Sequence, residues 1–313
     1  MRDTFIASLT KLAARDPRVF LITGDLGFAV LDEYSRTRPN QFLNAGVAEQ
    51  NMTGLATGLA LDGRVVFTYS IGNFPTLRPL EQIRNDAAYH EANVNVVAVG
   101  GGFSYGALGM SHHATEDLAI LRALPGVTVV APGDDWETEC AVPALAAARG
   151  TTYLRLDRSS AGRTQREGET FVLGKARRLR EGSDVTLVST GGILSVVLAA
   201  ADELSEQHRI RCRVLSMHTI VPLDAEALFD AARETGGVVT IEEHSVHGGL
   251  GGAVAETLLE SGVVPRAFHR IGLRAGFSSI VGSQDYLRTA YGMDAPAIVD
   301  AVRSLAPRLG TGR

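Results

Sequence analysis

Short, largely apolar runs recur along the first half of the chain and are separated by segments with a helical pattern. These runs are Val19–Ile22, Arg64–Tyr69, Val94–Val99, Val127–Ala131 and Tyr153–Leu156. Apolar strands that alternate with helices are typical of a parallel sheet whose two faces are both covered. The first half is therefore predicted to be an α/β domain.

A polar passage rich in glycine and arginine, Ser159–Glu169, interrupts this pattern. A second series of apolar runs follows it at Val185–Ser189, Cys212–Leu215 and Val238–Ile241, and alanine-rich helical patterns come after them. We therefore expect two doubly wound α/β domains, formed by residues 1–165 and 166–313.

Composition narrows the function classes. The chain has 313 residues, 45% of them hydrophobic, and a formal net charge of −5 without a long block of one sign, which argues against nucleic acid and membrane surfaces as partners. No apolar run approaches the ~20 residues that span a bilayer, and the N-terminus has an amphipathic helical pattern instead of a signal peptide. The two cysteines, Cys140 and Cys212, suit neither a zinc site nor a disulfide framework. We expect a cytoplasmic protein without a metal site of its own.

Ligands of open parallel sheets gather beyond the carboxyl ends of the strands. The loops expected there are Gly24–Gly27, Ser70–Arg78 and Gly100–His113, and all three belong to the first domain. The predicted site therefore lies in the first half of the chain.

One carboxylate, Glu49, precedes a small, apolar helical segment that contains Gly54 and Gly58. An acidic side chain in a first helical turn often does no more than complement the helix dipole. Interior glycines, however, cost roughly 1 kcal/mol each relative to alanine, and they indicate that something packs closely against this helix. We therefore predict that Glu49 is a functional acid.

Several motifs carry a family resemblance. The segment Asn44–Gln50 resembles the pyrimidine-binding motif of thiamine-diphosphate enzymes of the transketolase group. Further similar segments follow in order, namely Gly24-Asp25, Tyr69–Arg78, Ser111-His112, Val129–Pro132, His218–Asp224 and Glu242–Gly251. The resemblance covers nearly the whole chain. It implies a parallel-sheet pyrimidine-binding domain followed by a mixed-sheet C-terminal transketolase domain.

The resemblance implies that thiamine diphosphate is the cofactor and that Glu49 hydrogen-bonds the pyrimidine ring nitrogen N1′. That bond favours the tautomer that takes the proton from the thiazolium carbon, so Glu49 is a catalytic and cofactor-binding candidate. Phe74, Tyr69 and Phe67 are the aromatic candidates for stacking on the pyrimidine, and Asp25 is a further cofactor contact. Phe67 and Tyr69, two apart on a strand, could equally face a core, so Phe74 is the first choice.

Substrate contacts are implied in the same way. His112 matches a substrate-contacting histidine that would orient or shuttle protons at substrate hydroxyls, and Arg158 matches a guanidinium that grips the substrate phosphate. Arg158 could instead form a salt bridge at the domain boundary. Arg78 is a second phosphate candidate, and His113 is a weaker candidate than its neighbour.

The sequence departs from the family in the donor-binding loop. Transketolases that use ordinary pentose phosphates carry a histidine early in the loop occupied here by Gly101–Ser104, and an aspartate shortly before the substrate-contacting histidine. The loop here reads Gly106–Met110 without either group. We therefore expect an unusual donor, with Ser104 as the candidate to replace part of the polar contact.

The resemblance also implies a partner. The Gly-Asp-Gly signature that holds magnesium and the cofactor diphosphate does not occur in this sequence. An N-terminal transketolase subunit would supply that domain, and two copies of each chain would form an α2β2 heterotetramer.

The leading hypothesis is the C-terminal subunit of a split transketolase, which transfers a two-carbon ketol unit from a ketose, expected to be phosphorylated, to an aldehyde. The alternatives are a pyruvate-decarboxylating enzyme and a non-catalytic assembly subunit. The pyruvate-decarboxylating enzyme could resemble deoxyxylulose-phosphate synthase or the beta chain of a 2-oxo acid dehydrogenase. Ser111-His112 and Arg158 favour sugar phosphates, and an intact Glu49 argues against the assembly subunit.

Overall fold

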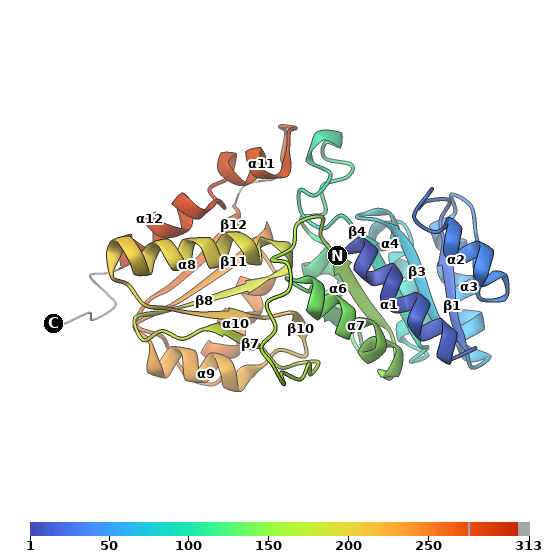
Figure 1. Ribbon diagram of the computed structural model, residues 1–313, viewed down its shortest axis with the longest axis horizontal. Coiled ribbons are helices and arrows are strands. Elements are labelled where there is room, and N and C mark those ends of the chain that lie inside the picture. Colours follow the sequence, from blue (N-terminus) through green and yellow to red (C-terminus); the bar gives the residue numbers. More distant parts are fainter. Residues whose placement is uncertain (275, 306–313) are drawn as a thin grey trace.

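The computed structural model describes residues 1–274 and 276–305, which form two sheets side by side (Figure 1). The first sheet has seven strands in the order β10-β5-β6-β4-β3-β1-β2, and the second has five in the order β12-β11-β8-β9-β7. The end of the second expected domain, residues 306–313, lies outside the described residues.

The strands of the first sheet are β1 (Val19–Thr23), β2 (Phe42–Asn44), β3 (Val65–Ile71), β4 (Val94–Val99), β5 (Thr128–Val130), β6 (Thr152–Leu156) and β10 (Thr219–Val221). Those of the second sheet are β7 (Arg177–Arg180), β8 (Val185–Thr190), β9 (Cys212–Ser216), β11 (Val238–Ser245) and β12 (Phe268–Leu273). The α-helices are α1 (Arg2–Arg15), α2 (Asp32–Thr37), α3 (Glu49–Leu61), α4 (Phe74–Leu77), α5 (Leu80–Gln82), α6 (Asp117–Arg122), α7 (Asp135–Ala147), α8 (Leu194–His208), α9 (Ala225–Glu234), α10 (Leu250–Glu260), α11 (Gln284–Ala290) and α12 (Ala295–Leu305). A π-helical turn covers Ile83–Ala88, and short 3-10 turns cover Pro39–Gln41, Gly106–Leu108 and Gly191–Ile193.

The first sheet is parallel except at one edge. Its central strands are buried on both faces, as their apolar sequences require. Phe5 and Leu9 of α1 pack on one face together with α2 and α7. Met52 and Ala56 of α3 pack on the other face with the π-helical turn and α6. The predicted α/β fold with both faces covered is confirmed.

The second sheet is mixed, as predicted, because β7 runs antiparallel to β9 while the other pairs are parallel. Helices α8 and α12 pack on one face of this sheet, and α9 and α10 pack on the other. One strand was not expected from the sequence. Strand β10, from the second half of the chain, pairs antiparallel with β5 and so extends the first sheet.

Buried polar groups join the two sheets. Glu243, on β11, accepts a hydrogen bond from the backbone N–H of Phe103 at 2.5 Å and one from Gln284 at 2.9 Å. Its carboxylate also pairs with Arg288, which is only 3% exposed. In the same region, Arg155 on β6 donates to the backbone carbonyl of Glu243 at 2.8 Å. The junction therefore fixes the loop that follows β4 against the second sheet.

We expect Glu243→Gln to destabilise the protein by about 3–5 kcal/mol, because it leaves the buried guanidinium of Arg288 with only the exposed carboxylate of Asp285, 3.6 Å away, as a counter-charge among the described residues. Glu91→Gln is the matched control, since Glu91 is 61% exposed and pairs with an arginine that is 89% exposed. Urea denaturation of both variants measures the difference. Equal unfolding midpoints for the two variants would contradict this role of Glu243.

Candidate functional site

Glu49 is the first residue of α3, and its side chain is only 4% exposed. Strand β2 ends at Asn44, and Gly46, with a φ of +75°, turns the chain into the helix. The helix start lies against the end of β1, where a Cβ added at Gly24 would lie 3.8 Å from the Glu49 Oε1 atom. The carboxylate is thus buried at the carboxyl edge of the first sheet, as the motif predicts.

Arg78 neutralises this carboxylate. Its Nη1 atom lies 2.7 Å from the Oε1 atom of Glu49, and its side chain is 46% exposed. The guanidinium carbon lies 4.0 Å from the ring centroid of Phe74, the half-buried first residue of α4. Because the guanidinium is partly exposed, solvent screens the pair, and a ligand with comparable interactions can displace Arg78.

His112 completes this cluster. Its ring lies edge-on to the ring of Phe74, with centroids 5.2 Å apart, and its Nδ1 atom lies 3.0 Å from the hydroxyl of Ser111. The pKa of His112 is lowered, chiefly because burial disfavours the charged ring, and further because His113 and Arg78 lie nearby. His112 is therefore less readily protonated than an ordinary histidine.

Phe67 and Tyr69 lie apart from this cluster. Their side chains are 0% and 3% exposed and belong to the apolar core on the α1 face of the sheet, whereas α3 covers the opposite face. Phe5 packs against both, with ring centroids 6.2 Å and 6.1 Å away. Phe74 is therefore the aromatic candidate that the structure brings to Glu49.

Asp25 lies in the loop after β1 in a left-handed conformation with a φ of 59°. Asn44 donates to its carboxylate at 2.9 Å and accepts from its backbone N–H at 3.0 Å. The same Asn44 oxygen accepts from the backbone N–H of Gly46. This pair ties the two loops that flank Glu49 together, and a cofactor contact for Asp25 stays a prediction.

Ser104 and Arg158 lie beside an open cleft of about 630 Å³ between the loop after β4 and α11. Ser104 is buried and accepts from the backbone N–H of Arg158 at 3.1 Å, so its hydroxyl holds that residue in place. The guanidinium of Arg158 is exposed and lies 5.8 Å from the ring centroid of Tyr105. Arg158 therefore presents a positive charge to the cleft.

His113 points into the protein. It is 3% exposed, its Nε2 atom lies 3.0 Å from the backbone carbonyl of Gly106, and its ring packs edge-on against Phe103. His113 therefore holds the loop in shape. Its neighbour His112 is the more accessible of the two histidines.

Tyr105 is the residue that the sequence interpretation missed. Its ring lies 6.3 Å from that of His112 on one side and near the guanidinium of Arg158 on the other. The site residues therefore form one continuous series from Glu49 through Phe74 and His112 to Arg158. The available signal was that Gly100–Ala107 carries two aromatic residues, Phe103 and Tyr105, among otherwise small residues.

The surroundings of Gly54 and Gly58 differ from the close packing that the sequence predicted. A Cβ added at either glycine would meet no heavy atom within 4 Å, and both residues are exposed. The prediction that something packs closely against these glycines is thus wrong for contacts within the described chain. They lie on the open side of α3, alongside the exposed Leu55 and Leu61.

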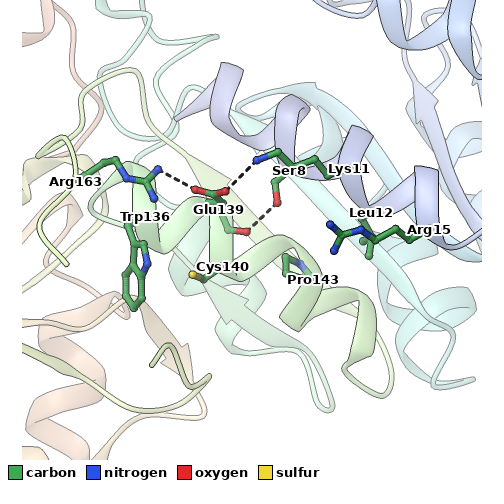
Figure 2. Close-up of a pocket in the computed structure, with 9 residues that line it drawn as sticks. All are labelled: Ser8, Lys11, Leu12, Arg15, Trp136, Glu139, Cys140, Pro143 and Arg163. Atoms are coloured by element: carbon green, nitrogen blue, oxygen red, sulfur yellow. Dashed lines mark hydrogen bonds and ion pairs between the residues drawn. The ribbon is translucent and has the colours of Figure 1, made fainter. Parts of the chain in front are cut away.

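A second cavity, of about 390 Å³, lies elsewhere between α1 and α7 (Figure 2). Glu139 lies between Lys11 at 3.3 Å and Arg163 at 2.8 Å, so its carboxylate is already paired. Burial raises the pKa of the nearby Cys140 thiol, which keeps that sulfur protonated and unreactive. This cavity shares no residue with the Glu49 cluster, and we assign it no chemistry.

The described part of the chain also has no group of three or more His, Cys, Asp or Glu side chains placed to hold a metal ion. Among the same residues, none of the helices is long and apolar enough to cross a membrane.

Comparisons with known proteins identify the family of this chain. Residues 1–163 match the pyrimidine-binding domain of transketolase, and residues 174–298 match its C-terminal domain. The chain belongs to the transketolase family. This membership confirms the resemblance predicted from the sequence motifs.

Similar proteins of this family include separate subunits. The chain is 40% identical to the 6-deoxy-6-sulfo-D-fructose transketolase subunit of Clostridium sp. (strain MSTE9), over 98% of this chain and 95% of the relative. It is 37% identical to an apulose-4-phosphate transketolase subunit of Phocaeicola vulgatus, over 95% of this chain and 94% of the relative. A split-gene transketolase, solved as an inactive beta4 tetramer, superposes with a TM-score of 0.89 at 35% identity and covers 98% of both chains. These matches favour the transketolase interpretation over the pyruvate-decarboxylating alternatives.

We expect Phe67→Ala to lower the free energy of unfolding by about 3–5 kcal/mol, because it empties a fully buried site in the core. Phe28→Ala is the matched control, since Phe28 is 77% exposed, and its effect should stay within about 0.5 kcal/mol. Chemical denaturation measures both. If Phe67→Ala left stability intact and instead weakened cofactor binding in the assembled enzyme, the core assignment would be wrong.

Proposed function

We propose that this chain is the pyrimidine-binding subunit of a split, thiamine-diphosphate-dependent transketolase. It would transfer a two-carbon ketol unit from a phosphorylated or otherwise anionic ketose to an aldehyde acceptor. The observation that carries the proposal is the buried carboxylate of Glu49 beside the aromatic face of Phe74. The subunit-type relatives, which this chain matches over nearly their full lengths, support it.

The side chains of Glu49 and Phe74 fit the pyrimidine end of the cofactor. Glu49 offers a desolvated acceptor, and Phe74 offers a flat apolar face close to it. Thiamine diphosphate, when bound, supplies the nucleophilic carbon that breaks and forms the carbon–carbon bond. Glu49 would hold a proton at ring nitrogen N1′, and low exposure strengthens that hydrogen bond.

The other side chains of the series would act on the substrate. His112 would accept or return a proton at a substrate hydroxyl, and its lowered pKa favours the neutral ring that can accept one. Arg158 would bind the anionic group of the ketose with its planar fork of donors. Tyr105, between these two residues, would form the wall of the substrate channel.

The partner would be an N-terminal transketolase subunit that holds Mg²⁺ and the cofactor diphosphate, within an α2β2 heterotetramer. Exposed apolar side chains at the two ends of α3 support an interface along this helix, because Val47 is 73% exposed and Leu61 is 60% exposed. Gly54 and Gly58 would let the partner backbone approach α3 closely. The two free cysteines fit a cytoplasmic enzyme.

Glu49→Gln should lower turnover of the reconstituted two-subunit enzyme by about 10²–10⁴-fold, because an amide cannot exchange the proton at N1′. Glu81→Gln, an exposed glutamate on α5, is the control and should keep full turnover. Ketol transfer is measured by product formation, and assembly by gel filtration. Near-normal turnover of Glu49→Gln would refute the proposed function. A wild-type mixture that binds no thiamine diphosphate would instead support a non-catalytic assembly subunit.

Arg158→Met should raise the KM for a phosphorylated ketose by about ten- to a hundredfold, because a charge-assisted hydrogen bond contributes about 1.5–3 kcal/mol. An uncharged ketose should show little change. Arg166→Met, in the exposed segment after β6, is the control. Equal effects of Arg158→Met on charged and uncharged ketoses would show that Arg158 does not bind the anion.

A further inference from the structure

Arg78 already makes the two interactions that a pyrimidine would need at this site. Its Nη1 atom donates to Glu49 at 2.7 Å, and its guanidinium carbon lies over the ring of Phe74, 4.0 Å from the ring centroid. A guanidinium and an aminopyrimidine share the relevant chemistry, since both are planar π systems with N–H donors at the edge. The face of Phe74 next to Glu49 can hold only one such group.

We propose that Arg78 is a placeholder, which occupies the pyrimidine position in the cofactor-free subunit and leaves it when the cofactor binds. This inference rests on the proposed function. The placeholder satisfies the buried carboxylate of Glu49 while the subunit is unassembled, because a buried charge without a partner is strongly destabilising. It also makes cofactor binding a competition, in which the incoming ring must break the Glu49–Arg78 pair.

The surroundings of Arg78 allow it to move. Its side chain is 46% exposed, whereas that of Glu49 is 4% exposed, so the guanidinium has a route to solvent and the carboxylate does not. Arg78 directly follows α4, a helix of a single turn, and the backbone continues into the next short helix at Leu80. Rotation of a long, half-exposed side chain is enough to vacate the face of Phe74, and the backbone can stay in place.

The test is calorimetric titration of thiamine diphosphate, with Mg²⁺ present, into the reconstituted two-subunit complex. Arg78→Met should tighten the Kd of the cofactor about three- to tenfold, because the competing ion pair and stacking contact are gone. Arg78→Lys, which keeps the charge and loses the planar group, should tighten it by a smaller factor. Arg84→Met is the control, since Arg84 bonds only its exposed neighbour Asn85 among the hydrogen bonds of the described side chains.

Unchanged cofactor binding by Arg78→Met would overturn the placeholder, and weakened binding would overturn it and assign Arg78 a role in holding the cofactor. If the methionine variant fails to fold, the cofactor Kd of Arg78→Lys provides the same test. A crystal structure of the complex with thiamine diphosphate gives a second readout. The placeholder requires Arg78 to lie off the ring of Phe74 there, and a retained Glu49–Arg78 pair beside the bound cofactor would overturn it.

Failure of this inference can be told apart from failure of the proposed function. If Glu49→Gln abolishes turnover while Arg78→Met binds the cofactor no more tightly than wild type, only the placeholder is wrong. If Glu49→Gln turns over normally, the proposed function itself is wrong, whatever the affinity of the Arg78 variants.

Discussion

The burial of one carboxylate organises the first sheet's functional edge. A carboxylate that leaves water without compensation loses several kcal/mol of solvation, yet Glu49 is only 4% exposed. Its position in the first turn of α3 gives partial compensation through the helix dipole, and Arg78 gives the rest. Because Arg78 follows α4 and stacks on Phe74, that pairing also draws the segment after β3 towards the start of α3. The His112 loop then packs against Phe74, so a single buried charge brings three separate loops together.

The second sheet shapes the other end of the site through the domain junction. Glu243 binds the backbone of Phe103, and Asp157 accepts from the backbone N–H of Gly192 at 2.6 Å. The loop after β4 and the segment that carries Arg158 are therefore anchored to residues of the second domain. A change in how the two sheets pack would move Tyr105 and Arg158 relative to Glu49. The packing of the second domain therefore sets the positions of these two side chains.

Local patterns in the sequence predicted the strands that are buried along their whole length. They did not predict features that depend on contacts between segments far apart in the sequence. Apolar runs such as Val94–Val99 predicted central strands, because only a sheet covered on both faces buries every residue. The edge strand β10 has only three residues and pairs across the domains, so no local pattern indicates it. Alternation on β3 places Phe67 and Tyr69 on the same face, but only their packing against Phe5 reveals which face. The Glu49–Arg78 pair joins residues 29 apart in sequence, and no periodicity predicts it.

The loop after β4 has no room for a side chain at Gly101. A Cβ at Gly101 would lie 1.8 Å from the Nε atom of Arg155 and 2.2 Å from a carboxylate oxygen of Asp157, so any side chain there collides with a buried ion pair. Arg155 and Asp157 are both 2% exposed and also bind backbone groups of the second domain, so neither can move aside without breaking the junction. Glycine at position 101 is thus coupled to the domain packing. The absence of a side chain at this point leaves room for the junction. The groups that face the cleft beside it include Tyr105 and Arg158.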